Sequence, residues 1–179
     1  DGMWEQARAA LNVLEKETGK RFGDPTNPLL VSVRSGAKVS MPGMMDTILN
    51  LGLNTASVTG IAKASNNERF AYDAYRRFIQ MFGKIVQDVP AEVFEEHLSN
   101  FKARVGALND TDLTSDHLKE IVGKFLALVE EIAGEPFPQD PQEQLSLATK
   151  AVFASWNGKR AIAYRNFQGI PHDLGTAVN

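Results

Sequence analysis

The sequence contains no cysteine, which excludes disulfides, a thiolate nucleophile and cysteine metal ligands. It also has no apolar run approaching the roughly 20 residues of a membrane-spanning helix. The run at residues 125–129 is among its longest. The chain does not open with a basic segment followed by an apolar one, as a secretory signal does. We therefore expect a soluble chain with no membrane segment, in a reducing, cytoplasmic compartment.

An excess of positive charge is missing as well. The 179 residues include 19 Lys and Arg against 22 Asp and Glu, which gives a formal net charge of -3. Binding to nucleic acid needs clustered basic residues, so the composition argues against that class of partner. Hydrophobic residues make up 43% of the chain, enough for one sizeable core or two small ones. Because the chain starts at Asp1 and stops at Asn179 without a tail-like composition, we interpret both ends as cut points in a longer protein.

Apolar residues recur at intervals of three and four through most of the chain, which predicts helices. We expect helices at residues 3–18, 69–82, 90–101, 114–133, 141–156 and 159–167. Asp112 or Thr114 is the expected cap of the fourth helix, and Asp140 that of the fifth. Residues 29–33 are apolar, partly β-branched and too short for a helix, so they predict a buried strand. The proline-rich residues 134–141 predict a connector, and the fold class is mainly α with a small α+β portion.

Residues 32–48, between the strand and the helices, resemble neither a core element nor a plain turn. They combine fixed positive charge, hydroxyl donors, and glycines that let backbone N–H groups approach an anion closely. The residues concerned are Arg34, Lys38, Ser32, Ser35, Ser40, Thr47, Gly36 and Gly43. Together they predict a cradle for a polyphosphate, although the spacing is not that of a Walker A loop.

Arg34 follows the predicted strand directly, and the strand would fix the direction of its guanidinium fork. We predict that it positions nucleotide phosphates and offsets charge on the transferred group, without a proton-transfer role. The alternative is a pair with a surface carboxylate, which a lone Arg-Ser-Gly would favour but a pattern of this length does not. Met41, Met44 and Met45 stay open between adaptable core residues and the lining or hinge of a nucleotide pocket.

Residues 27–54, which read NPLLVSVRSGAKVSMPGMMDTILNLGLN, closely resemble the signature of the pyruvate, phosphate dikinase family. The resemblance continues through RFAYDAYRRFIQMF at 69–82, DTDLTSDHLKE at 110–120 and AVFASWNGKRAIAYR at 151–165, so it covers nearly the whole chain. Phosphoenolpyruvate synthases share the Val-Arg-Ser start but lack the Ser-Met-Pro-Gly-Met-Met-Asp-Thr run, which favours the dikinases.

The resemblance implies a full-length phosphotransferase that interconverts ATP, phosphate and pyruvate with AMP, pyrophosphate and phosphoenolpyruvate through a phosphohistidine, with Mg²⁺. It implies an ATP-grasp nucleotide-binding region, a swinging phosphohistidine domain and a barrel that binds phosphoenolpyruvate or pyruvate, in a homodimer. The ATP-binding lysine, the acidic Mg²⁺ ligands and the transfer histidine would lie outside this chain. We therefore expect the chain alone to be inactive and to contain no metal ligands.

In that family the arginine matching Arg34 contacts the nucleotide, and residues 36–47 match a flexible loop on its phosphate side. Arg34 is accordingly the predicted catalytic residue. The predicted ATP- and AMP-binding residues are Arg34, Ser35, Gly36, Ala37, Met41, Gly43, Met44, Met45, Asp46, Thr47 and Arg77.

Arg77 shares its predicted helix with Arg69, Asp73 and Arg76, and such clusters are usually solvated helix surface. The alternative is a face directed at the phosphates or at the swinging domain. Two further sets of residues have plain interpretations. His97, His117 and His172 are expected to be ordinary helix or loop residues, and Lys159, Arg160 and Arg165 either form a basic edge or balance helix dipoles.

The predicted architecture is a helical subdomain, residues 54–139, inserted into an incomplete ATP-grasp domain formed by residues 1–53 and 140–179. Its sheet should look truncated and leave apolar surface exposed. Two other functions compete with this hypothesis. One is a phosphoenolpyruvate synthase-type enzyme, and the other is a helical protein-interaction module without a nucleotide role.

Overall fold

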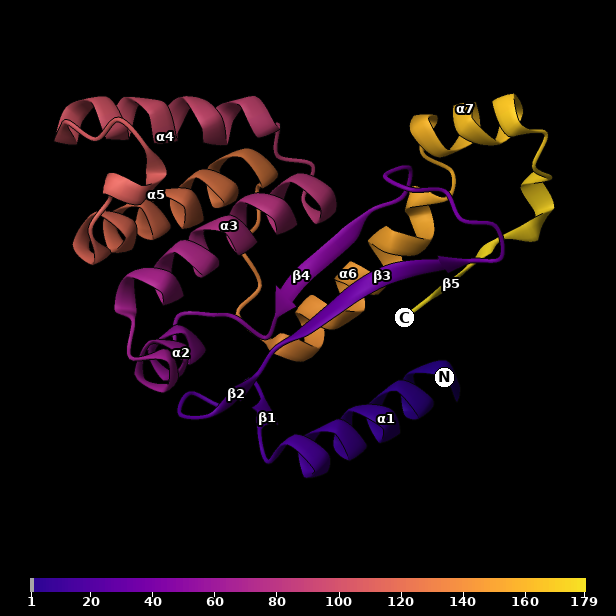
Figure 1. Ribbon diagram of the computed structural model, residues 1–179, viewed down its shortest axis with the longest axis horizontal. Helices are drawn as coiled ribbons and strands as arrows, with labels where there is room; N and C mark the ends of the chain where they lie inside the picture. The colour runs from indigo at the N-terminus through magenta and orange to yellow at the C-terminus, as the bar shows by residue number, and fades with distance from the viewer. Residues whose placement is uncertain (1) are drawn as a thin grey trace.

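The computed structural model describes residues 2–179, which form mainly helices around a small sheet (Figure 1). The helices are α1 (Gly2–Thr18), α2 (Ser57–Ser65), α3 (Glu68–Val86), α4 (Ala91–Val105), α5 (Ser115–Ala133), α6 (Pro141–Ser155) and α7 (Lys159–Gln168), with short 3-10 turns η1 (Asp110–Asp112) and η2 (His172–Leu174). The strands are β1 (Arg21–Phe22), β2 (Pro28–Leu29), β3 (Val31–Ala37), β4 (Thr47–Leu51) and β5 (Thr176–Val178). This confirms the predicted mainly α fold class with a small β portion.

The main sheet has the order β4-β3-β5, and β3 pairs antiparallel with both neighbours. The prediction for this region was partly wrong. The expected strand at 29–33 is interrupted at Leu30, and β3 continues to Ala37, so Arg34 lies within a strand rather than after one. Its backbone is held by the chain end, because Arg34 N–H donates to the Asn179 carbonyl at 2.9 Å and Asn179 N–H donates back at 2.8 Å. Strands β4 and β5 were not predicted.

The helices begin and end at residues whose side chains or backbone suit those positions. The Thr114 hydroxyl, not Asp112, caps α5 by accepting from the His117 N–H at 3.2 Å. That helix ends at Gly134, whose φ of 74° is left-handed and therefore favours glycine. Asp140 caps α6 as predicted, accepting from the Gln142 N–H at 3.0 Å. These caps satisfy N–H groups that a helix leaves unpaired at its start.

Helix α3 is the centre of the core, with α5 and α4 on one side and the β3–β4 hairpin and α6 on the other (Figure 1). Phe137, from the proline-rich connector, packs edge-on against Phe78 and Phe82 of α3, with ring centroids 5.5 and 5.2 Å apart. One buried cluster includes side chains from β3, from the helices α3 to α5 and from α6. The division at residues 53 and 139 stays a prediction.

Helix α1 lies along one edge of the molecule (Figure 1) and buries little of its surface. Leu11 is its buried residue, whereas Met3, Val13 and Leu14 remain exposed. The predicted helix is therefore confirmed, but most of its apolar stripe is not buried against residues 2–179. Across those residues, every helix is too short or too polar to cross a membrane.

Candidate functional site

A recess of about 390 Å³ lies between the end of β3, the start of β4 and the loop that connects them. Residues 34–43 line it, together with Met45 and Thr47. Most of the predicted nucleotide-binding residues therefore lie around one hollow. Met44 and Asp46 belong to the same loop but do not line this recess.

Arg34 is placed by the alternation of β3. Successive side chains of a strand point to opposite faces, so Val33 is buried while Arg34 is exposed. Across the hairpin Arg34 pairs in register with Thr47, so a guanidinium and a hydroxyl flank the recess. Among the described residues, no ion pair involves Arg34, and its charge is therefore not neutralised by a carboxylate of this part of the chain.

Residues 38–46 connect the two strands and carry the remaining predicted contacts. Gly43 has a φ of 72°, a left-handed conformation that glycine adopts without strain. Met41 is buried, whereas Met44 and Met45 are half-buried, so only Met41 fits a core role outright. The Met44 N–H donates to the Met41 carbonyl at 3.1 Å, which closes a turn inside the loop.

A second recess, of about 430 Å³, lies beside the first and shares Met45 and Thr47 with it. Helix α3 contributes Arg77 and Lys84 to it, and α7 contributes Arg160. These three cations face two carboxylates, which belong to Asp46 and Glu95, so positive charge is in excess. The fold thus brings Arg77 to the hairpin loop, about 30 residues away in sequence.

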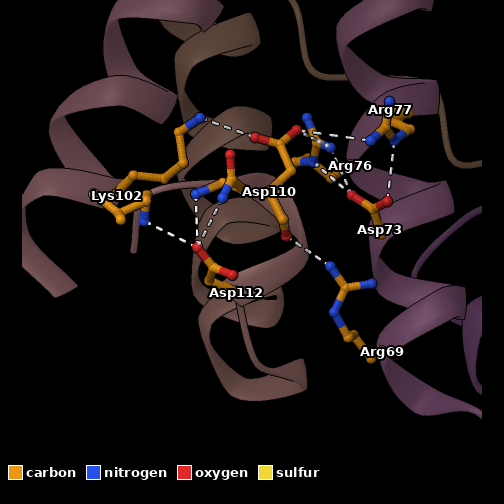
Figure 2. A network of polar contacts seen from close by, with 9 residues as sticks. Arg69, Asp73, Arg76, Arg77, Lys102, Asp110 and Asp112 are labelled. Carbon is orange, nitrogen blue, oxygen red and sulfur yellow. Dashed lines mark hydrogen bonds and ion pairs between the residues drawn. The ribbon is translucent and has the colours of Figure 1, made fainter. Parts of the chain in front are cut away.

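Arg77 is held in place by a network of ion pairs that joins α3 to η1 and α4 (Figure 2). Its Nε donates to Asp73 Oδ2 at 3.0 Å, and its Nη2 lies 3.6 Å from Asp110 Oδ2. Arg76 is buried between the same two carboxylates, at 2.6 and 3.1 Å. The solvated-surface interpretation is therefore wrong for Arg76, which is 2% exposed, and fits only Arg77, which is 60% exposed.

Asp110 completes this network and could not be found from helical spacing. Lys102 donates to it at 2.9 Å, and the Arg69 guanidinium bonds the backbone carbonyls of Asp110 and Leu113. Burial raises the pKa of Asp110, but the hydrogen bond from Lys102 and the surrounding positive charges outweigh burial and lower that pKa overall. Burial likewise raises the pKa of Asp73, and the hydrogen bonds and charges of Arg76 and Arg77 lower it below its usual value.

Arg165 is not part of a basic edge, which corrects one of the two expectations for it. It is 1% exposed, and its guanidinium stacks 4.0 Å above the Trp156 ring. It also donates to the Trp156 carbonyl at 2.7 Å and to His172 Nδ1 at 2.9 Å. Arg165 therefore fixes α7 to the end of α6.

Between residues 2 and 179, His, Asp and Glu do not gather in groups of three or more that could hold a metal ion.

Comparison with known proteins identifies the family of this chain. A family model described as the pyruvate phosphate dikinase, AMP/ATP-binding domain matches residues 2–179. The chain is 56% identical over 176 residues to pyruvate, phosphate dikinase of Clostridium symbiosum, covering 98% of this chain and 20% of that protein. It is 54% identical over 178 residues to the chloroplastic pyruvate, phosphate dikinase 1 of Oryza sativa subsp. japonica, covering 99% of this chain and 19% of that protein. It is 52% identical over 179 residues to pyruvate, phosphate dikinase of Rhizobium meliloti, covering 100% of this chain and 20% of that protein. The chain thus spans about one fifth of the length of these relatives.

Proposed function

Because this chain belongs to the pyruvate phosphate dikinase AMP/ATP-binding domain family, we propose that its β3–β4 hairpin binds the phosphates of ATP. The observation that carries the proposal is Arg34, an exposed guanidinium on a strand whose neighbouring side chain is buried in the core. Such a fork can bind two phosphate oxygens at once, and the rigid strand limits the entropy lost on binding. Ser35, Thr47 and the loop backbone supply further donors around the same recess.

In this proposal Arg34 acts by placement and charge. Phosphoryl transfer needs little covalent chemistry from the protein, because positioning and neutralisation of the transferred group lower the barrier. Because a guanidinium in a protein keeps its charge, Arg34 would stabilise negative charge and transfer no proton. Arg77 approaches from α3 and would add positive charge at the far side of the loop.

The whole protein is proposed to interconvert ATP, phosphate and pyruvate with AMP, pyrophosphate and phosphoenolpyruvate through a phosphohistidine. The chain would then be one part of an ATP-grasp region, working with phosphohistidine and phosphoenolpyruvate/pyruvate domains of the same cytoplasmic, homodimeric protein. Mg²⁺ belongs to the proposal, but the carboxylates of residues 2–179 do not fit a Mg²⁺ site, since Asp46 pairs with Arg160 and no group of three or more acidic or histidine side chains gathers there. No step is therefore assigned to Mg²⁺ within this chain.

Hydrogen exchange of the full-length protein, with and without ATP, tests the proposal. We expect ATP to slow amide exchange in residues 34–47 and to leave the solvent-facing side of α5 unchanged. Unchanged exchange throughout residues 34–47 at saturating ATP would favour the helical interaction module instead. Measuring whether turnover requires inorganic phosphate as acceptor, rather than water, separates the dikinase from a phosphoenolpyruvate synthase-type enzyme.

A further inference from the structure

We propose that Arg160, on α7, is a positioning residue for the hairpin loop, and that it acts through Asp46. This inference rests on the proposed function, because the loop formed by residues 38–46 matters only if it meets the phosphates. It concerns a contact between segments more than 100 residues apart in the sequence. It assigns Arg160 no contact with ATP.

Three polar contacts attach the loop to the C-terminal helices. Arg160 Nη2 donates to Asp46 Oδ1 at 3.1 Å, and Arg160 Nη1 donates to the Gly43 carbonyl at 3.5 Å. The Asp46 N–H donates to the Ser155 hydroxyl at 3.2 Å. That hydroxyl is oriented to accept, because its own proton goes to the Val152 carbonyl at 2.7 Å.

The two sides of this contact differ in rigidity. The helix side is fixed, since Ala161 is buried and Arg165 stacks on Trp156. The loop side is anchored by the buried Met41 but has few hydrogen bonds of its own. Apart from strand pairing, the described backbone hydrogen bonds of residues 38–46 comprise the single turn between Met41 and Met44. The conformation of the loop after Met41 therefore depends on the contacts that Arg160 and Ser155 make with Gly43 and Asp46.

The solvent exposure of the Arg160–Asp46 pair limits how strongly the pair can hold the loop. Arg160 is 67% exposed and Asp46 is 28% exposed, so solvent screens their attraction. A pair of this kind shifts an equilibrium by about two- to fivefold. Such a bias favours the ordered loop but still lets it move aside, which suits a segment that must admit and release a nucleotide. When only a fraction of molecules is competent to bind, the apparent affinity falls by that fraction.

Hydrogen exchange and kinetics of full-length variants test this inference together. In Arg160→Ala we expect amides of residues 38–47 to exchange about two- to fivefold faster, and KM for ATP to rise by a similar factor. The value of kcat should change less, because bound ATP restores the loop. Lys159→Ala is the matched control, since Lys159 is the exposed neighbour on α7 and joins no ion pair among the described residues.

A double-mutant cycle separates positioning from an independent effect of Arg160. Asp46→Ala should reproduce the loop exchange of Arg160→Ala, and the double variant should be no worse than the worse single variant. Arg160→Lys and the charge exchange Arg160→Asp with Asp46→Arg should each restore part of the protection. Unchanged loop exchange in Arg160→Ala, or strictly additive effects in the cycle, would overturn the inference. An unchanged KM in Arg34→Ala would instead remove the proposed ATP site, while the exchange data still decide whether Arg160 holds the loop.

Discussion

Burial separates five arginines of this chain into two groups. Arg76 and Arg165 are almost fully buried, and their donors are engaged by carboxylates, carbonyls or a ring. Arg34, Arg77 and Arg160 keep their guanidinium groups exposed, and all three line the two recesses at the hairpin. The buried arginines stabilise the fold. Of the exposed ones, Arg77 and Arg160 pair with carboxylates, whereas Arg34 joins no ion pair among the described residues and is the one that we propose to bind phosphate.

Removing Asp110 should destabilise the fold because it leaves the buried Arg76 with one carboxylate instead of two. We expect Asp110→Ala to lower the free energy of unfolding by about 1–3 kcal/mol, measured by urea denaturation. Asp116→Ala is the control, because Asp116 is 88% exposed and its pair with Lys119 is at the surface. That change should stay within about 0.5 kcal/mol. Equal effects of the two substitutions would contradict the structural role of Asp110.

The ion-pair network also makes a prediction for acid stability. The pKa values of Asp73 and Asp110 are lowered in the folded state, so both groups favour folding above their unfolded pKa of about 4. This contribution is lost as the pH falls through the lower folded pKa values. We expect the free energy of unfolding to decrease from about pH 5 downward, and this decrease to be smaller in Asp73→Asn. A stability that rises on acidification would show that these pKa values are not lowered.

Two helical glycines, Gly60 and Gly123, test how closely α2 and α5 pack against the rest of the chain. A Cβ at Gly60 of α2 would lie 2.6 Å from the Pro25 carbonyl oxygen, whereas a Cβ at Gly123 of α5 would meet nothing within 4 Å. Gly60→Ala should therefore destabilise by about 1–3 kcal/mol through overpacking. Gly123→Ala should stabilise α5 by up to about 1 kcal/mol. Thermal unfolding of both variants measures the difference, and a neutral Gly60→Ala would show that α2 is free to move away from Pro25.

The elements divide into those that local sequence predicts and those that distant partners decide. The α5 and α6 helices were predictable because their caps, Thr114 and Asp140, and their apolar periods are local signals. The end of β3 was not, because residues 35–37 are small or polar and form a strand only by pairing with β5 near residue 177. β4 was missed for a different reason: its apolar residues do not alternate cleanly, because Leu49 is apolar but exposed.

The candidate site shows the same division. The hairpin residues around Arg34 were predictable as a group because they are contiguous in sequence. The contacts that hold the site were not. Asp110 reaches Arg76 across 34 positions and Arg160 reaches Asp46 across 114, and no local pattern encodes either distance.

At the scale of the whole molecule, packing is uneven. Helix α3 buries seven residues, whereas α1 buries Leu11 and leaves Met3 half exposed. Local opening costs least where few apolar side chains are buried. In the isolated chain we therefore expect amides of α1 to exchange fastest among the long helices and those of α3 slowest, as measured by hydrogen exchange. Equal protection of α1 and α3 would show that the exposed apolar face of α1 is covered, for instance by a second copy.

The central claim is that the exposed guanidinium of Arg34 binds the phosphates of ATP. The most direct test is the ATP affinity of the full-length protein with Arg34→Ala, compared with Arg34→Lys. Loss of a charge-assisted hydrogen bond predicts roughly 10- to 100-fold weaker binding for the alanine variant, and an intermediate value for lysine, which keeps the charge but not the fork. ATP binding that is as tight in Arg34→Ala as in the unaltered protein would contradict the claim.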